Sequence, residues 1–151
     1  MRRWNGWGDD TIDNVINADA LEFLQQRIGH GTPPKDVTLA QSCKAVPPSR
    51  LLQHRMVDTS AELRMHNSHG QSLPDWLKIR FGKIEHFPDG VAFPESSEQV
   101  RELLSYAKAC GAAVIPYGGG TSVVGHLTVP QSAQPVLSMN MSRLSDRKSV
   151  V

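Results

Sequence analysis

The feature that most constrains this chain is a strand–helix–strand pattern between residues 87 and 117. Two short apolar runs, "GVAFP" at residues 90–94 and "AAVIP" at residues 112–116, flank a polar stretch with helical periodicity. Within that stretch the apolar positions follow the spacing of one buried helical face: Val100, Leu103, Leu104 and Ala107. The pattern predicts a βαβ unit with parallel strands and a right-handed crossover.

Local signals mark the ends of this helix and predict the rest of the chain. Ser96 with Gln99 predicts a capping box, and Gly111 predicts the carboxyl-terminal stop. Residues 1 to about 80 predict short helices joined by loops. The stretch "NADALEFLQQRIGHG" predicts a helix with one apolar face, formed by Leu21, Leu24 and Ile28 and ended by Gly29 or Gly31. The stretch "MHNSHGQSLPDW" at residues 65–76 predicts a polar, turn-like loop. "PVLSMNMSRLS", residues 135–145, predicts a further strand and its exit.

Composition bounds the class of protein. The 151 residues suit one domain or part of a larger one, and 39% hydrophobic with 21% charged residues is typical of a globular chain. A net charge of +1 argues against a surface-wide site for polyanions, so no nucleic-acid partner is expected. No apolar run approaches the ~20 residues of a membrane span. Two cysteines, Cys43 and Cys110, give no disulfide framework and predict a cytoplasmic location.

A glycine run after the second predicted strand is the strongest candidate binding site. It follows the carboxyl end of that strand, where open α/β sheets bind ligands. Consecutive backbone N–H groups without side chains can form an anion-binding nest, and two hydroxyls follow. Neither the Walker motif nor G-x-G-x-x-G is present, and a merely flexible connection is the alternative. The candidate residues are Pro116, Tyr117, Gly118, Gly119, Gly120, Thr121 and Ser122.

Other candidates are weaker. His66 and His69 have the spacing of metal ligands on a helix, but no third ligand has a recognisable spacing, so no metal site is predicted. Cys110 is expected to be a small buried residue beside Gly111. Trp4 and Trp7 are expected to pack the amino-terminal segment onto the rest of the protein. No Gly-x-Ser-x-Gly elbow supports nucleophilic hydrolysis.

Three stretches in order resemble the FAD-linked oxidases of the vanillyl-alcohol oxidase superfamily. Residues 87–127 are similar to the start of their PCMH-type FAD-binding domain, with a "P-D-x-V-x-x-P" strand at Pro88–Pro94 and a "P-x-G-G-G-T-S" loop at Pro116–Ser122. The stretches "RWNGWG", Arg3–Gly8, and "SHGQSLPDW", Ser68–Trp76, resemble the alkyldihydroxyacetonephosphate synthase branch.

The resemblance implies an α+β fold, with a helical and loop region followed by the first βαβ part of an incomplete PCMH-type domain. It implies that the loop backbone contacts the FAD pyrophosphate. The residue after Gly120 is Thr121 rather than the histidine that tethers FAD in some members, so non-covalent FAD is expected. His126 has the wrong offset for a tether and is interpreted as a loop histidine.

The activity implied for the full-length protein is exchange of an acyl for an alkyl chain on dihydroxyacetone phosphate, with a small-molecule or lipid substrate. The alternatives are an FAD-dependent oxidoreductase such as a 2-hydroxy-acid dehydrogenase, and a non-catalytic binding fragment. Catalytic residues are expected beyond this chain, which is expected to be inactive alone. A homodimer is left open, and a peroxisomal location is expected for a eukaryotic source.

The expected domain division is 1–84 for the helical region, 85–145 for the beginning of the FAD-binding domain, and 146–151 for an artefactual tail. The tail hypothesis rests on "DRKSVV", because these residues could be encoded by a series of codons that resembles a sequencing adapter.

Overall fold

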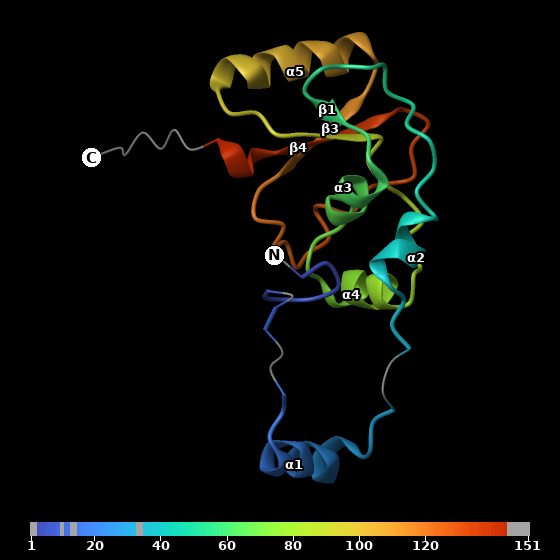
Figure 1. Ribbon diagram of the computed structural model, residues 1–151, viewed down its shortest axis with the longest axis vertical. Coiled ribbons are helices and arrows are strands. Elements are labelled where there is room, and N and C mark those ends of the chain that lie inside the picture. Colours follow the sequence, from blue (N-terminus) through green and yellow to red (C-terminus); the bar gives the residue numbers. More distant parts are fainter. Residues whose placement is uncertain (1–2, 10, 13–14, 33–34, 145–151) are drawn as a thin grey trace, which may run out of the picture.

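The computed structural model describes residues 3–9, 11–12, 15–32 and 35–144, and Figure 1 shows its α+β architecture. The expected tail at 146–151 lies outside these residues. The strands are β1 (Val57–Asp58), β2 (Gly90–Ala92), β3 (Ala113–Tyr117) and β4 (Val136–Asn140). The helices are α1 (Ala18–Ile28), α2 (Leu39–Cys43), α3 (Ala61–His66), α4 (Leu73–Arg80), α5 (Ser97–Ala109) and the 3₁₀ helix Met141–Arg143. In the described part of the chain, no helix is both long enough and apolar enough to cross a bilayer.

The four strands form one mixed sheet in the order β1-β2-β4-β3. Both predicted strands, β2 and β3, run parallel to β4, and β1 pairs antiparallel with β2. The prediction that these two strands are parallel is confirmed. They do not pair with each other, because β4 lies between them. Pro116 explains this placement, since a proline has no N–H to donate and is tolerated best in an edge strand. The central position goes to β4, whose five residues are all buried.

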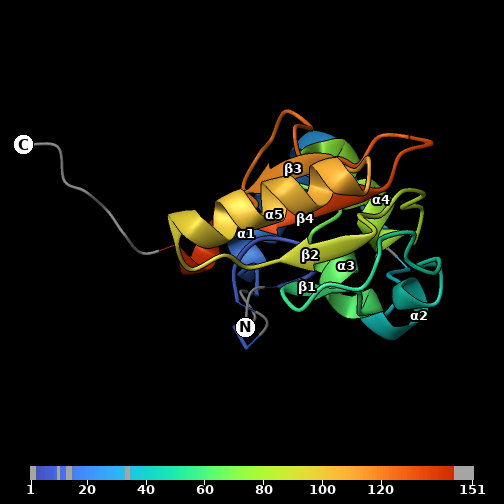
Figure 2. The same cartoon turned by 90° about the horizontal axis from the view of Figure 1, so that it is seen from above.

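The sheet is covered on both faces (Figure 2). Helix α5 packs on one face, where Leu103 and Ala107 join the strand residues Ala92, Leu137 and Met139 in one buried cluster. The alternate residues of the strands contact the segment around α3. The Asn140 side-chain amide donates to Asn67 Oδ1 at 2.8 Å, and the Tyr117 hydroxyl donates to the His66 carbonyl at 3.0 Å. The period-two alternation therefore directs Leu137 and Met139 toward α5 and places Val136, Ser138 and Asn140 on the opposite face of β4.

Helix α5 follows its predicted signals with one change. The Ser96 hydroxyl accepts from the Gln99 N–H, as in a capping box. The Gln99 side chain, however, accepts from the N–H of Glu95 rather than from that of Ser96, so the predicted box is only half formed. At the other end Gly111 has φ 64°, a left-handed conformation that glycine adopts at low cost, and the predicted stop is confirmed.

Two side chains of α5 differ from the prediction. Leu104 is 48% exposed, because the contact with the sheet is narrow and Leu103 and Ala107 fill it. Cys110 is only partly buried, since it is the C-cap residue and lies at the end of the helix rather than over the sheet. Both predictions of burial are therefore wrong.

The stretch predicted as a polar, turn-like loop, residues 65–76, is a turn only in its middle, and both of its ends are helical. The segment ends α3, begins α4, and is largely buried between them. Its polar groups are satisfied internally, as buried polar groups must be. Asp75 and Ser72 form a capping box at the start of α4, and the Trp76 indole N–H donates to Gln71 Oε1 at 2.6 Å. The polar composition thus builds a buried hydrogen-bonded layer, not a surface loop.

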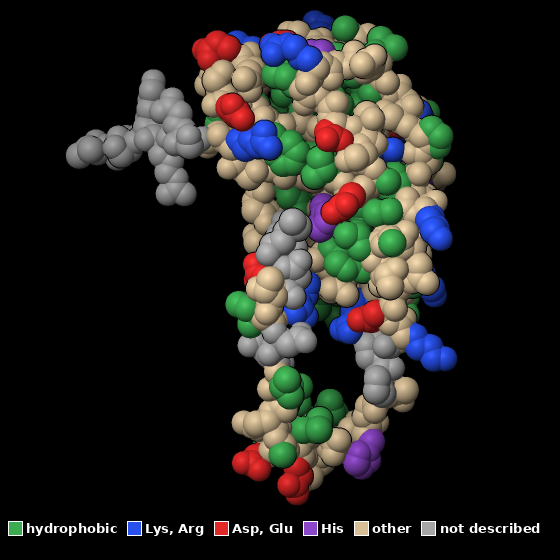
Figure 3. Space-filling model, viewed as in Figure 1, with side chains coloured by type: hydrophobic (Ala, Val, Ile, Leu, Met, Phe, Trp, Pro, Cys, Tyr) green, Lys and Arg blue, Asp and Glu red, His purple; other side chains and the backbone are tan. Residues whose placement is uncertain are grey.

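Helix α1 forms as predicted and ends at Gly29, whose φ is 80°. No residue of α1 is buried among the described residues, so the predicted apolar face is exposed. Figure 1 shows α1 apart from the other elements, and Figure 3 shows hydrophobic side chains gathered on it. The exposed apolar residues of this helix are Leu21, Phe23, Leu24 and Ile28.

An ion pair fixes the start of β2 against the chain before β4. The Asp89 carboxylate is 2% exposed as a residue and accepts from Nε and Nη2 of Arg50 at 2.9 and 2.8 Å. It also accepts from the N–H of Val136 at 2.8 Å. Burial alone would raise the pKa of Asp89, but the hydrogen bonds from Arg50 and from the Val136 N–H outweigh it, and the pKa lies below its ordinary value of 3.8.

We expect Asp89→Asn to lower the free energy of unfolding by about 2 kcal/mol at neutral pH, because a charge-assisted pair is lost. Because the folded pKa is depressed, this stabilisation is fully present above the ordinary value of 3.8 and is lost as pH falls below that value and through the lower folded pKa. Denaturant unfolding at pH 7 and at low pH measures the difference, which should shrink in acid. Asp19→Asn, an exposed carboxylate in the first turn of α1, is the control. A loss for Asp89→Asn that is equally large in acid would contradict the electrostatic explanation.

Candidate functional site

The glycine run lies where the sequence predicts, just after the carboxyl end of edge strand β3. Pro116 and Tyr117 are the last residues of that strand. Tyr117 is 2% exposed and its hydroxyl is bonded to His66, so its side chain belongs to the core and only its backbone is available to a ligand. Gly120 is buried, and Ser122 is partly buried. The exposed members of the candidate site are Pro116, Gly118, Gly119 and Thr121.

The three glycines are required for different reasons. Gly120 has φ 66°, a left-handed conformation that disfavours any side chain. Gly118 and Gly119 do not have a positive φ. A Cβ at Gly118 would have no atom within 4 Å, and a Cβ at Gly119 would meet only Thr121 Cγ2, at an ordinary 3.7 Å. Neither backbone conformation nor packing among the described residues explains why these two positions lack side chains. A ligand that approaches this backbone closely would explain it.

A second segment, residues 68–71, packs against the glycine loop and the chain that follows it. The Gln71 N–H donates to the Ser122 carbonyl at 2.7 Å, and the Val129 N–H donates to the Ser68 carbonyl at 3.4 Å. Gly70 lies so close to Ser122 that an added Cβ would collide with the Ser122 carbonyl oxygen. Residues 68–71 therefore form a platform, a segment that packs directly against the glycine loop. This close packing is possible because Gly70 has no side chain. Sequence reasoning missed this platform; a glycine inside a polar segment was the one available signal.

The hydroxyl of Ser122 is buried and has no hydrogen-bond partner among the described residues. A buried hydroxyl without a partner is uncommon, and a bound ligand is one of its ordinary explanations. Together with the open space at Gly118 and Gly119, this hydroxyl gives the loop the donors and the room that a phosphate group requires.

Of the two amino-terminal tryptophans predicted to pack onto the rest of the protein, Trp7 does so. The rings of Trp7 and Trp76 meet edge to face with centroids 6.3 Å apart, which is a favourable aromatic geometry. A hollow of about 110 Å³ lies between this segment and the loop. Its lining residues are Gly6, Trp7, Gly8, Gln71, Gly119 and Thr121. The three stretches that carry the resemblance, far apart in sequence, thus meet at one place.

The histidine candidates fall outside this arrangement. His69 is 3% exposed and its Nδ1 shares a 3.0 Å hydrogen bond with the Ser68 hydroxyl, so it belongs to the buried polar layer. His66 ends α3, and His126 lies exposed in the loop after the glycines. Among the residues that the structure describes, no three His, Cys, Asp or Glu side chains are grouped as metal ligands.

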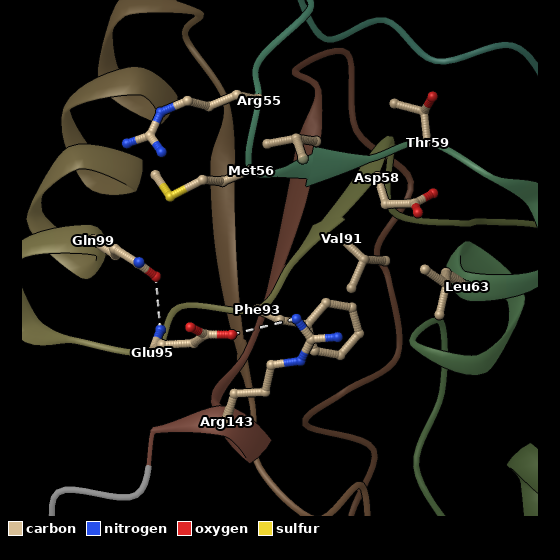
Figure 4. Close-up of a pocket in the computed structure, with 11 residues that line it drawn as sticks. Arg55, Met56, Asp58, Thr59, Leu63, Val91, Phe93, Glu95, Gln99 and Arg143 are labelled. Atoms are coloured by element: carbon tan, nitrogen blue, oxygen red, sulfur yellow. Dashed lines mark hydrogen bonds and ion pairs between the residues drawn. The ribbon is translucent and has the colours of Figure 1, made fainter.

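A larger hollow, about 570 Å³, lies at the β1–β2 edge of the sheet, and the described residues that line it include none of the glycine loop (Figure 4). Three of its four charged side chains are in ion pairs, and the fourth, Asp58, accepts from the Ser60 N–H at 2.7 Å. Arg143 lies 3.5 Å from Glu95 and stacks over the Phe93 ring, and Arg55 pairs with Glu102 at 2.8 Å. Size alone therefore does not identify the binding site here, and the unexplained glycines are the better guide.

Comparison with known proteins agrees with the geometry. Residues 88–150 match the FAD binding domain family. The resemblance to FAD-linked oxidases is confirmed. The chain is 28% identical over 171 aligned residues to the alkyldihydroxyacetonephosphate synthase of Caenorhabditis elegans, covering 94% of this chain and 29% of that protein. It is 30% identical over 134 residues to the Dictyostelium discoideum synthase, covering 88% of this chain and 21% of that protein.

A solved structure of an alkyldihydroxyacetonephosphate synthase has the same fold, with a TM-score of 0.72 at 18% identity. The match covers 94% of this chain and 33% of that one. This chain therefore spans about a third or less of the length of these synthases, and within it residues 88–150 resemble the FAD binding domain family. The predicted α+β fold, with part of a PCMH-type domain, is confirmed.

Proposed function

We propose that this chain forms the pyrophosphate-binding part of an FAD-dependent enzyme that replaces the acyl chain of acyl-dihydroxyacetone phosphate with an alkyl chain. One observation supports the cofactor site. Neither the backbone conformation nor the packing of the described residues requires glycine at Gly118 and Gly119. The substrate class rests on the similarity to the synthases.

The residues of the loop fit this cofactor. Gly118 and Gly119 are exposed and carry no side chain, so a phosphate group can approach the backbone closely at these two positions. Thr121 and Ser122 add hydroxyl donors, and Gly70 and Gln71 hold the loop in place from the other side. Bound FAD would supply the reactive ring, and the residues of this chain would bind and orient its phosphates. Groups that contact the ring and the substrate are expected outside these 151 residues, which we expect to be inactive alone.

The cofactor is proposed to be non-covalent, because Thr121 occupies the position after the glycine run. We expect acid or heat denaturation of the full-length holoprotein to release all yellow flavin into the supernatant, measured by its absorbance after centrifugation. Flavin that stays with the precipitate would show a covalent attachment.

The activity is tested on the full-length protein with acyl-dihydroxyacetone phosphate and a long-chain alcohol, following formation of the alkyl product by mass spectrometry. Product formation that depends on added FAD supports the proposal. Reduction of the flavin by a 2-hydroxy acid, with no alkyl product, would instead favour the oxidoreductase alternative. The expected compartment, the cytoplasm or the peroxisome of a eukaryote, stays a prediction.

A further inference from the structure

We infer that the turn Arg3–Gly8 forms the second wall of the pyrophosphate site, facing the glycine loop across the hollow between them. This inference rests on the proposed function, because it assigns further residues to the same cofactor site. It would make the amino-terminal turn part of the FAD-binding surface rather than a separate packing segment.

The lining of the hollow is suited to an anion. Three of its lining residues, Gly6, Gly8 and Gly119, have no side chain, so backbone forms opposite walls. Thr121 and Gln71 add polar side chains, and among the residues that the structure describes no carboxylate lines the hollow. Its volume of about 110 Å³ is several times the roughly 10–15 Å³ that a cavity needs to hold one water molecule, so the hollow has room for a group larger than water, such as a phosphate.

The turn is closed by its own contacts. The Arg3 N–H donates to the Gly8 carbonyl at 2.9 Å, and the Arg3 guanidinium donates to the Ile12 carbonyl at 2.8 Å. The stem of Arg3 lies beside Gly6, where an added Cβ would be 3.6 Å from Arg3 Cδ. These contacts hold the turn in the shape that places Gly6, Trp7 and Gly8 along the hollow.

A chain of contacts connects the turn to the loop. Trp7 packs against Trp76, whose indole N–H donates to Gln71 Oε1 at 2.6 Å. Gln71 in turn donates its backbone N–H to Ser122 at 2.7 Å. The two walls are thus held relative to each other through one residue, Gln71, which contacts both the tryptophan pair and the loop.

Gly6 allows a direct test. Its φ is not positive, and its Cβ would meet only Arg3 Cδ at an ordinary distance, so the fold tolerates a side chain at this residue, which lines the hollow. Gly31 is the matched control, because it has neither a positive φ nor any atom within 4 Å of an added Cβ. FAD is titrated into full-length apoprotein of the wild type, Gly6→Val, Gly6→Ala and Gly31→Val, and Kd is measured by flavin fluorescence. Thermal unfolding of each apoprotein is measured alongside.

We expect Gly6→Val to raise the Kd for FAD about tenfold or more, the effect of losing one hydrogen bond to a charged group. Gly6→Ala should have a smaller effect in the same direction, and it keeps the test decisive if valine hinders folding. Gly31→Val should leave Kd unchanged, and no Gly6 variant should lower the apoprotein Tm. Wild-type Kd for both Gly6 variants would overturn the inference.

The same titration with Gly118→Ala separates the two proposals. If Gly118→Ala weakens FAD binding and the Gly6 variants do not, only the second wall is refuted. If the wild type does not bind FAD, or Gly118→Ala binds it normally, the proposed cofactor site itself fails.

Discussion

Gly119→Val in the full-length protein is expected to remove most of the bound FAD while the apoprotein keeps its fold. The valine Cβ would meet only Thr121 Cγ2 at 3.7 Å, and φ at Gly119 is not positive, so the loop itself tolerates a side chain. The valine side chain would, however, block the approach of the FAD phosphates to this backbone. Loss of two hydrogen bonds to a charged group, at about 1.5 kcal/mol each, corresponds to roughly 100-fold weaker binding. The flavin-to-protein absorbance ratio after purification and the Kd for added FAD measure the effect.

Gly31→Val is the control for this experiment, since the same change at Gly31 meets no atom within 4 Å and lies outside the loop. Its flavin content should equal that of the wild type. Undiminished flavin in Gly119→Val would show that the phosphates do not pass over this backbone. A large loss of apoprotein stability in Gly119→Val would show that the glycine serves the fold instead.

Gly70→Ala is expected to act on both stability and FAD binding. The new methyl would collide with the backbone carbonyl of Ser122, which cannot move without breaking its hydrogen bond from Gln71. Forcing one extra carbon into a well-packed site costs about 1–3 kcal/mol, which should appear in denaturant unfolding of the apoprotein. Because the loop would be displaced, the Kd for FAD should also rise. Each loss of about 1.4 kcal/mol in binding free energy raises the Kd about tenfold.

The matched comparison for Gly70→Ala is Gly118→Ala. At Gly118 an added methyl has open space in the fold, so we expect wild-type apoprotein stability with weakened FAD binding. Gly70→Ala should show both losses. If Gly70→Ala lowered stability without changing the Kd for FAD, the platform at residues 68–71 would support the fold but not the position of the loop.

Much of this protein follows from local sequence. The periodicity of Val100, Leu103 and Ala107 predicts α5, Gly111 predicts its end, and the apolar runs predict β2 and β3. The glycine run is likewise recognisable as a candidate site. These features depend on neighbouring residues, because helices, strand alternation and turns are determined by backbone conformation and hydrogen bonding over a few positions.

Only the tertiary structure decided which of these elements meet. Strand β4 lies between β2 and β3, and residues 67–72 are buried rather than exposed, while the apolar face of α1 is left uncovered. The hydrogen bond from Gln71 to Ser122 and the close approach of Gly70 join segments about fifty residues apart. Such contacts depend on the packing of the whole chain, which no local pattern records. The sequence therefore determined where the glycine loop begins, and the tertiary structure decided which residues surround it.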